Sequence, residues 1–305
     1  MDKKIAVLLP CYNEALTIGK VVGDFRNVLP DAAIYVYDNN SSDGSGEIAA
    51  RNGAVVRRVL QQGKGHVVRR MFQEIDADVY VMVDSDDTYP ADEVLKLIAP
   101  IVAGEADMVV GDRLSSVYRT ENKRPGHNFG NALVCGLVKW LWNYPVRDVM
   151  SGYRVFSRRF VKTCPVLSNG FEIETEMTLH TLDKRLCLVE IPVQYRDRPK
   201  GSVSKLNTLP DGIRVLRTIF NMFRFYRPLA FFGIMGMLLS VVSVAMVCPV
   251  FVEYFKSGLV PRFPTLIVAC FLLTAALLSF VVALILDAVK KQSDLAFELS
   301  LSRMS

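Results

Sequence analysis

Histidine and cysteine are scarce in this chain of 305 residues. It has three histidines and six cysteines, and no two cysteines form a Cys-x-x-Cys pair. A zinc site or a disulfide framework is therefore not expected, which suits a reducing compartment. Glycine is limited to 19 residues, which excludes a collagen-like or low-complexity chain. The hydrophobic fraction of 51% excludes a disordered chain, because it can support a packed core.

Two other signals are missing. A signal peptide is not expected, because residues 1–4 precede only five apolar residues before Pro10. No G-x-x-x-x-G-K-[ST] loop occurs, so a P-loop ATPase has no support. Charge is present but uneven: residues 196–227 hold eight basic and two acidic residues, in a chain with a net charge of +5. Such a segment could face nucleic acid, phosphate ligands or an anionic membrane.

Two long uncharged segments decide between these partners. Residues 229–252 and 263–286 contain no charged side chain. Each exceeds the ~20 residues needed to cross a bilayer core, and neither has the polar face of a soluble helix. The short connection over 253–262 makes them a transmembrane hairpin. We therefore expect the lipid bilayer as a partner and no nucleic acid.

Lysine and arginine near the ends of these spans predict the orientation. Four arginines precede the first span and two lysines follow the second, against Lys256 and Arg262 in the loop. Both termini and a domain over 1–205 should therefore be cytoplasmic, in a multi-pass protein of the inner or plasma membrane. An amphipathic helix over 206–228 should lie at the membrane interface, and 287–305 should form a cytoplasmic tail.

Short apolar runs alternate with segments of helical spacing before the basic segment. Strands are expected at 5–9, 34–37, 54–59, 79–83, 108–110, 153–156 and 186–191. Helices are expected at 15–29, 45–51, 64–75, 91–103, 127–141 and 171–182. This alternation predicts an α/β domain with a mainly parallel sheet.

Polar turns follow three of these strands, at 10–14, 38–44 and 84–87. Because ligands of such folds bind at the carboxyl ends of the strands, the three turns should form one site. The Asp-Ser-Asp of the last turn is the sharpest feature. Two carboxylates at i and i+2 can share Mg²⁺ or Mn²⁺ with a diphosphate. A turn that caps the following helix is the alternative.

Three further features can each be interpreted as part of a binding site or as ordinary structure. Asp38 stands where α/β folds often bind a ribose, although the residues after it are also ordinary loop chemistry. Gly63-Lys64-Gly65 could hold phosphate at a helix N-terminus or be a flexible turn. The basic segment from Arg198 to Lys205 could bind a specific phosphate, or attract anionic lipid at about 1 kcal/mol per basic residue.

The glutamates at 172, 174 and 176, with His180, are expected to form a solvated helix face. This interpretation gives them no part in the predicted site.

Together these segments resemble glycosyltransferase family 2 and, within it, the polyprenyl-phosphate glycosyltransferases such as dolichol-phosphate mannose synthase. The matching residues are Pro10-Cys11-Tyr12-Asn13-Glu14, Asp38 to Ser45, Gly63-Lys64-Gly65, Asp84-Ser85-Asp86, Gly111-Asp112-Arg113, Asp148, Ser151-Gly152-Tyr153-Arg154, Arg198 and Ser204-Lys205. The resemblance covers nearly all of 1–210 and implies a GT-A (Rossmann-like) fold. The last basic segment and the hairpin point to a lipid-phosphate acceptor.

The resemblance implies a role for each candidate residue. A nucleotide sugar would be bound by Pro10, Tyr12, Glu14, Asp38, Lys64, Gly65, Asp84, Ser85, Asp86 and Arg113. The acceptor phosphate would be bound by Arg124, Arg198, Ser204 and Lys205. A metal ion, Mg²⁺ or Mn²⁺, would be held by Asp84, Asp86 and Thr88, and catalysis would involve Asp84, Asp86 and Asp148. Thr88 departs from the dolichol-phosphate mannose synthases, which usually have glutamine there, and Asp87 is another possible ligand.

The implied reaction moves a hexose from a UDP- or GDP-linked sugar to a polyprenyl phosphate with inversion, in cell-envelope glycan biosynthesis. The acceptor phosphate is already an anion, so no strong general base is needed. A different lipid acceptor is one alternative. A polysaccharide synthase is another, disfavoured because no Q-x-x-R-W segment occurs. A catalytically silent nucleotide-sugar-binding subunit is a third, disfavoured by the two intact aspartates. The small residues Gly233, Gly236, Ser240 and Ser243 of the first span can pack helices together, and a homo-oligomer is expected.

Overall fold

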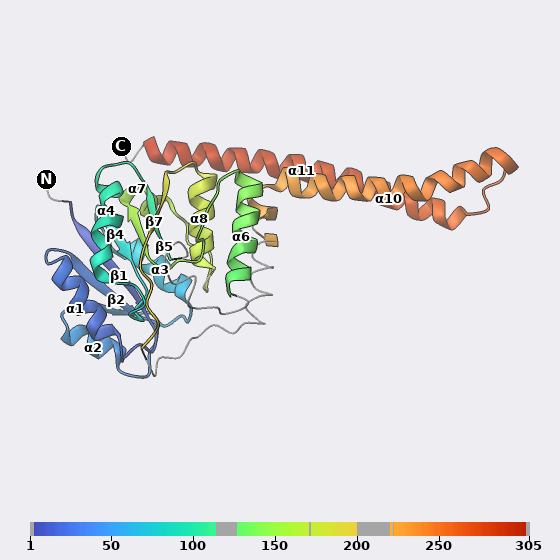
Figure 1. Ribbon diagram of the computed structural model, residues 1–305. Coiled ribbons are helices and arrows are strands. Elements are labelled where there is room, and N and C mark those ends of the chain that lie inside the picture. The colour runs from blue at the N-terminus through green and yellow to red at the C-terminus, as the bar shows by residue number, and fades with distance from the viewer. Residues whose placement is uncertain (1–2, 114–126, 171, 200–219, 222, 303–305) are drawn as a thin grey trace. The chain divides into compact units, whose positions relative to one another are not determined.

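The computed structural model describes residues 3–113, 127–170, 172–199, 220–221 and 223–302 (Figure 1). The chain falls into two compact units, Met1–Leu216 with Ser300–Ser305, and Arg217–Leu299. The first unit is an α/β structure and the second is built from two long helices.

One seven-stranded sheet forms the centre of the α/β unit. Its strands are β1 (Ile5–Cys11), β2 (Ala33–Asp38), β3 (Val55–Arg58), β4 (Val79–Met82), β5 (Met108–Asp112), β6 (Arg154–Ser157) and β7 (Leu188–Pro192). The strand order is β3-β2-β1-β4-β6-β5-β7. Strand β6 runs antiparallel to both of its neighbours, and the other pairs are parallel. The predicted α/β fold with a mainly parallel sheet is confirmed.

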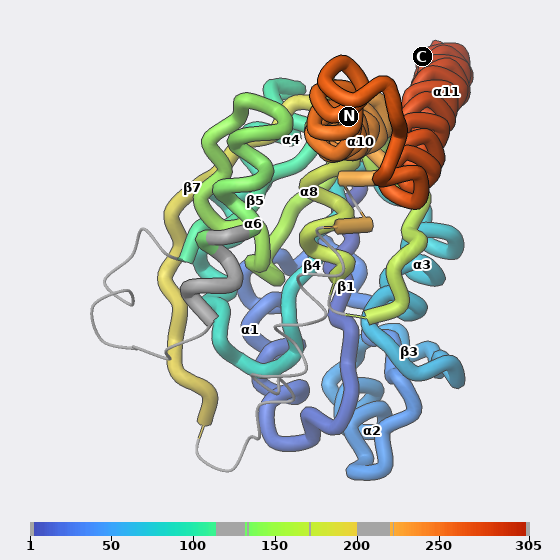
Figure 2. The backbone as a smooth tube through the Cα atoms, turned by 90° about the vertical axis from the view of Figure 1, so that its right-hand side faces the viewer, coloured from blue at the N-terminus to red at the C-terminus, as the bar shows by residue number. Residues whose placement is uncertain are grey.

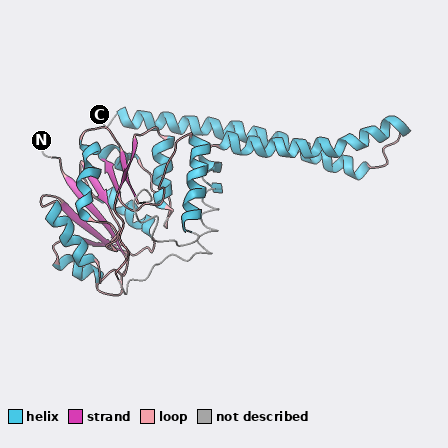
Figure 3. Ribbon diagram, in the orientation of Figure 1, coloured by secondary structure: helices cyan, strands magenta, loops and turns pink. Residues whose placement is uncertain are grey.

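Helices lie on both faces of this sheet (Figure 3). They are α1 (Ile18–Val28), α2 (Ser45–Arg51), α3 (Lys64–Glu74), the 3₁₀ turn η1 (Ala91–Glu93) with α4 (Val94–Val102), α6 (His127–Trp142), α7 (Arg158–Thr163) and α8 (Ile173–Asp183). Strand β1 lies between α1 and α3 in Figure 2. The layered arrangement leaves the carboxyl ends of the parallel strands open to ligands.

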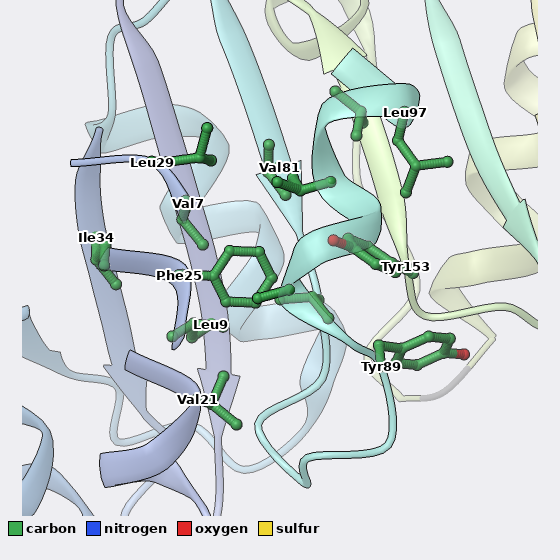
Figure 4. Close-up of a cluster of buried hydrophobic side chains, with 14 of the residues drawn as sticks. Val7, Leu9, Val21, Phe25, Leu29, Ile34, Val81, Tyr89, Leu97 and Tyr153 are labelled. Carbon is green, nitrogen blue, oxygen red and sulfur yellow. The ribbon is translucent and has the colours of Figure 1, made fainter. Parts of the chain in front are cut away.

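Successive side chains of a strand point to opposite faces of the sheet, so the hydrophobic core lies on two sides of it. Val7 and Leu9 of β1 belong to the same buried cluster as Val21 and Phe25 of α1, and Figure 4 shows these side chains together. The opposite side includes an edge-to-face contact between the rings of Phe72 in α3 and Phe156 in β6, with ring centroids 5.6 Å apart. Burial of such side chains contributes roughly 1.5–3 kcal/mol each, which fixes the strands that carry the polar turns.

Two elements of this unit differ from the sequence expectation. Helix α7 was not expected; it begins after Ser157, whose hydroxyl accepts a hydrogen bond from the Phe160 amide at 3.1 Å. Helix α8 was expected to have a solvated face, but every residue from Ile173 to Thr181 is buried. The solvated-face interpretation was therefore wrong: Lys64 of α3 pairs with the buried Glu174, and the backbone amides of Leu167 and Ser168 donate to the buried Glu176.

The second unit contains α10 (Pro228–Ser257) and α11 (Phe263–Ser302). Both helices are long and apolar enough to cross a membrane, with a mean hydropathy of 2.3 and 2.8 over their most apolar windows. Only 17% and 22% of the residues in these windows are buried. A buried core helix of a soluble protein would hide most of that surface, so the exposure favours a lipid-facing hairpin.

Small residues form the contact between α10 and α11. Six of the buried positions recur at seven-residue intervals, Gly236, Ser243 and Val250 on one helix and Ala269, Ala276 and Ala283 on the other; Pro228 and Ser279 are also buried. The Ser243 hydroxyl donates to the Ala269 carbonyl at 2.7 Å. Two of the small residues expected to favour an oligomer, Gly236 and Ser243, therefore face the second helix of the same chain, which leaves the oligomer a prediction.

Helix α11 continues well beyond the predicted span, which ended at residue 286. No glycine or proline interrupts the sequence there, and ion pairs link Asp287 to Lys291 at 2.9 Å and Lys290 to Asp294 at 3.0 Å. Of the amphipathic helix predicted over 206–228, residues 206–219 and 222 lie outside the described part of the chain. Its described residues 220–221 and 223–226 are helical.

Candidate active site

Hydrogen bonds join the polar turns that follow β1 and β4. The Ser85 hydroxyl donates to the Pro10 carbonyl at 2.9 Å, and the Thr17 hydroxyl donates to the Ser85 carbonyl at 2.7 Å. These bonds are possible because β4 lies directly beside β1 in the sheet. Pro10 and Ser85, predicted to belong to one site, therefore lie at the same sheet edge.

The turns after β1 and β2 are joined in the same way. The Glu14 amide donates to the Ser45 hydroxyl at 2.8 Å, and the Asn13 amide donates to the Ser41 hydroxyl at 2.9 Å. Glu14 and Asp38 are buried at this edge, whereas Tyr12 is 37% exposed. The joined turns thus carry a partly exposed aromatic ring and two buried carboxylates, residue types that suit a base and a ribose.

The Gly63-Lys64-Gly65 turn is shaped by a neighbouring backbone. A Cβ atom on Gly65 would lie 1.9 Å from the Ser168 carbonyl oxygen, and Gly63 has a φ of +131°. The Gly65 amide donates to the Asn169 carbonyl at 3.1 Å, so it is engaged within the protein and not turned toward a phosphate. The glycines are needed for this close approach, and Lys64 is the member of the turn that enters the site.

A buried ammonium connects three elements at the sheet edge. Lys64 at the start of α3 places Nζ 2.5 Å from Asp84 Oδ1 and 2.5 Å from Glu174 Oε1 of α8. Burial works to lower the pKa of Lys64, but the two carboxylates raise it above its ordinary value. Burial likewise works to raise the pKa of Asp84, yet the nearby charge of Lys64 holds it below its ordinary value. Glu174, which the sequence interpretation placed on a solvated face, is therefore part of the site.

Asp86 has a different set of partners. Its Oδ2 lies 2.5 Å from a guanidinium nitrogen of Arg198, and its Oδ1 accepts a hydrogen bond from the Thr88 hydroxyl at 2.6 Å. Burial and the neighbouring charge of Asp84 raise the pKa of Asp86 against the opposing charge of Arg198. Thr88, predicted as a metal ligand, is buried and orients Asp86 in this structure. Asp87, the other possible ligand, pairs with Lys20 at 2.7 Å.

Arg113 and Asp148 form a second buried ion pair near these carboxylates. Arg113 Nε and one terminal nitrogen lie 2.8 and 3.3 Å from the two carboxylate oxygens of Asp148. The guanidinium also lies over the ring of Tyr195, 5.5 Å from its centroid. Asp148 is fully buried, so the group of this pair that can act on a ligand is the Arg113 guanidinium.

Two residues of the Ser151-Gly152-Tyr153-Arg154 segment support this arrangement. A Cβ atom on Gly152 would lie 2.3 Å from Asp84 Oδ2, so only glycine leaves room for the carboxylate. Arg154 is fully buried, and its guanidinium donates to the carbonyls of Ser151 and Val149 at 2.8 and 2.6 Å. The family resemblance included this segment, but its pattern alone gave no role to the arginine.

The carboxylates of the site suit a hard divalent cation. Asp84 and Asp86 offer oxygen ligands, and Mg²⁺ in nucleotide sites is commonly held by one or two carboxylates together with phosphate oxygens. Within the described ranges, no cluster of three or more His, Cys, Asp or Glu side chains could hold a metal. The residues therefore fit a metal shared with a bound diphosphate and do not form an all-protein cage.

Three predicted acceptor residues, Arg124, Ser204 and Lys205, lie outside the described residues. Of that predicted set, the described part of the chain contains Arg198, and it lies against Asp86. The structure thus brings together the predicted donor-site residues and one predicted acceptor residue.

Known proteins share this chain's sequence and fold. The model of the family described as Glycosyl transferase family 2 matches residues 6–164, more than half of the chain. Glycosyltransferase AglJ of Haloferax volcanii is 33% identical over 76% of this chain and 76% of its own length. The dolichyl-phosphate hexose transferase of the same organism is 28% identical, over 70% of this chain and 92% of that protein.

A solved structure supports the fold. Glucosyl-3-phosphoglycerate synthase from Mycobacterium tuberculosis, in complex with Mn²⁺, uridine diphosphate and glucosyl-3-phosphoglycerate, aligns with a TM-score of 0.57. The identity is 21%, over 72% of this chain and 80% of that chain, so this likeness concerns the fold alone. Together with the family match, it agrees with a GT-A arrangement of the sheet and its polar edge. The chain belongs to glycosyltransferase family 2 and is a glycosyltransferase.

Proposed function

We propose that this enzyme moves a hexose from a UDP- or GDP-linked sugar to a polyprenyl phosphate at the cytoplasmic face of a membrane. The observation that carries the proposal is the group of three cations, Lys64, Arg113 and Arg198, around the carboxylates of one sheet edge. Both the donor diphosphate and the acceptor phosphate are anions, so such a group suits both. The dolichyl-phosphate relative and the two apolar helices favour a lipid acceptor.

The donor would bind along the joined turns. Tyr12 would stack on the base and Asp38 would bind the ribose, while Asp84 and Asp86 would hold Mg²⁺ or Mn²⁺. When bound, that metal would neutralise the charge that develops on the leaving diphosphate. Arg113 would donate to the same diphosphate, held in place by Asp148 and by the ring of Tyr195. In this proposal Asp148 is a positioning residue.

The transfer needs no proton to be removed. An oxygen of the acceptor phosphate forms a bond to the anomeric carbon from the face opposite the leaving group. The bond from that carbon to the diphosphate oxygen breaks, and its electron pair leaves with the nucleoside diphosphate. Arg198, with Arg124, Ser204 and Lys205, would bind the acceptor phosphate. The enzyme's contribution is therefore position and charge, which agrees with a site made of ion pairs.

The membrane arrangement completes the proposal. Residues 229–252 and 263–286 would cross the bilayer, with the catalytic domain over 1–205 and both termini in the cytoplasm. A helix over 206–228 at the interface would bring the basic segment to the lipid head groups. The acceptor could then reach the site without leaving the bilayer.

A transfer assay tests this function directly. Full-length protein in detergent is given undecaprenyl phosphate, Mg²⁺ or Mn²⁺, and each of a panel of radiolabelled UDP- and GDP-sugars. We expect label to move into the organic phase with one donor, and chelation of the metal to stop it. Donor binding without transfer to this lipid would favour another acceptor or a silent binding subunit.

A further inference from the structure

The two aspartates proposed to bind metal are each occupied by a cation of the chain itself. Lys64 lies 2.5 Å from Asp84, and Arg198 lies 2.5 Å from Asp86. The cations come from α3 and from the segment after β7, both distant in sequence from β4. A metal ion that binds Asp84 must therefore compete with an ammonium already in contact with that carboxylate.

Lys64 has a second buried acid beside its ammonium. Its Nζ is 2.5 Å from Glu174, and the side chains of Lys64 and Glu174 are only 10% and 6% exposed. Asp84, at 32%, is the most exposed member of the three. A ligand can thus reach Asp84, while the contact between Lys64 and Glu174 stays behind it.

The backbone on both sides of Lys64 is held by hydrogen bonds. The Gly63 amide donates to Asn39 Oδ1 at 2.8 Å, and the Gly65 amide donates to the Asn169 carbonyl at 3.1 Å. The contact with Glu174 can therefore retain an ammonium that leaves Asp84 without any movement of the main chain. A buried ammonium without any acid partner would be strongly unfavourable, and Glu174 prevents that state.

We propose that Lys64 is a resident counter-ion that neutralises Asp84 before the donor binds, and that Glu174 is the positioning residue that keeps its ammonium in the site when a metal takes Asp84. The released ammonium is then available to the donor diphosphate. This inference rests on the proposed function, in which Asp84 and Asp86 hold the metal. It assigns a role in donor loading to a glutamate that lies 110 residues from Lys64 in the sequence.

Binding of Mn²⁺ alone tests the inference without any turnover. Free Mn²⁺ is measured by electron paramagnetic resonance during titration of the full chain in detergent, without nucleotide. Lys64→Met should bind Mn²⁺ about tenfold more tightly than the wild type, because the competing cation is gone. Glu174→Gln should bind it several-fold more weakly, because Lys64 then has Asp84 alone as a partner. The effect of Glu174→Gln should shrink in the Lys64→Met background.

Lys20→Met is the matched control. Lys20 also pairs with an aspartate of the same turn, Asp87, but its side chain is 51% exposed. Its removal should change Mn²⁺ affinity by less than about twofold. Equal tightening by Lys20→Met and Lys64→Met would overturn the inference, because it would show only the general effect of removing a positive charge. Unchanged or weaker Mn²⁺ binding by a folded Lys64→Met protein would also overturn it.

Two further variants keep the outcomes distinct. The double variant Lys64→Met/Glu174→Gln loses one positive and one negative charge, and it should still bind Mn²⁺ more tightly than the wild type. It serves as the test if Lys64→Met alone does not fold. Weaker Mn²⁺ binding by this double variant would then contradict the inference. Asp84→Asn should abolish binding in the wild-type and Lys64→Met backgrounds. Mn²⁺ binding that survives Asp84→Asn would refute the metal site of the proposed function. Binding that depends on Asp84 but ignores Lys64 would refute the counter-ion alone.

Discussion

The α/β unit and the helical hairpin bury their polar groups by opposite means. In the α/β unit, buried charges are held by opposite charges, as Lys64 is by Asp84 and Glu174, or by several hydrogen bonds, as Arg154 is by backbone carbonyls. In the hairpin, the buried positions of the two helices are uncharged, and the hydroxyls of Ser243 and Ser279 donate to backbone carbonyls of the opposite helix. Water around the first unit offsets part of the desolvation of its charges, whereas hydrocarbon around the second would not.

This difference assigns separate tasks to the two units. Paired charges at a ligand edge can be re-paired with phosphates, so the α/β unit can perform chemistry on anions. A contact of small residues and helix backbone has nothing to exchange, so the hairpin can hold its geometry in lipid. Each task should therefore be removable without the other, and four substitutions test this separation.

The largest effect is expected from Asp86→Ala, which should lower transfer by about 10³-fold because the leaving diphosphate loses its charge neutralisation. The protein should remain folded and membrane-bound, since the hairpin is unaffected. Transfer, thermal unfolding and membrane partition are measured on the same preparation. Asp87→Asn is the control, because Asp87 pairs with Lys20 and a φ of +57° is tolerated by asparagine. Wild-type turnover by Asp86→Ala with metal present would remove Asp86 from the mechanism.

Arg154→Met should destabilise the α/β unit by about 3 kcal/mol, because it leaves buried carbonyls of the 149–151 turn without their donor. Chemical unfolding followed by circular dichroism gives the free energy. Arg159→Met is the comparison: Arg159 pairs with Asp107 at 2.6 Å, but its side chain is 52% exposed, so we expect a loss below about 1 kcal/mol. Equal losses of unfolding free energy in the two variants would mean that burial does not set how much each arginine stabilises the unit.

Gly236→Val tests the hairpin. A Cβ atom on Gly236 would lie 3.1 Å from the Ala276 carbonyl oxygen and 3.1 Å from the Phe280 ring, whereas one on Gly233 would have nothing within 4 Å. We expect Gly236→Val to weaken helix association by roughly 1–3 kcal/mol and Gly233→Val to have little effect. Thermal unfolding in detergent compares the two variants. Similar behaviour of both would argue against close packing of the small residues as the basis of this contact.

The smallest effect concerns pH and His180 of α8. Burial, with the nearby charge of Lys184, lowers the pKa of His180 from 6.5 to about 4. The unfolded chain therefore binds a proton first as pH falls, so stability is full above pH 6.5 and is lost toward pH 4, by about 1 kcal/mol at pH 5.5. Urea unfolding at pH 7.5 and 5.5 measures this loss. His180→Gln should remove that share of the pH dependence, and an unchanged dependence would contradict the assignment.

Local patterns predicted much of the fold. The apolar runs that form β1, β2 and β4 lie in a sheet that is covered on both faces. Such strands appear in the sequence as continuous hydrophobic segments. The aspartates after β4 were recognisable because they directly follow such a run. The small residues of α10 could also be recognised in the sequence, but the sequence did not show which helix they would face.

The partners of the charged residues could not be predicted in the same way. Glu174 has the sequence neighbours of an exposed helix, yet it is buried because Lys64 of α3 reaches it. Asp148 was expected to take part in catalysis, and that role remains a prediction. In the structure its carboxylate holds Arg113.

The sequence by itself determined the α/β alternation, the polar edge of the sheet and the two apolar helices. Periodicity and hydropathy act over a few neighbouring residues, so they can be read without a partner. Only the tertiary structure decided that β6 runs antiparallel between β4 and β5, and that Lys64 is shared by Asp84 and Glu174. A buried charge needs a counter-charge or a set of hydrogen-bond partners, and the fold supplies these by bringing distant segments together.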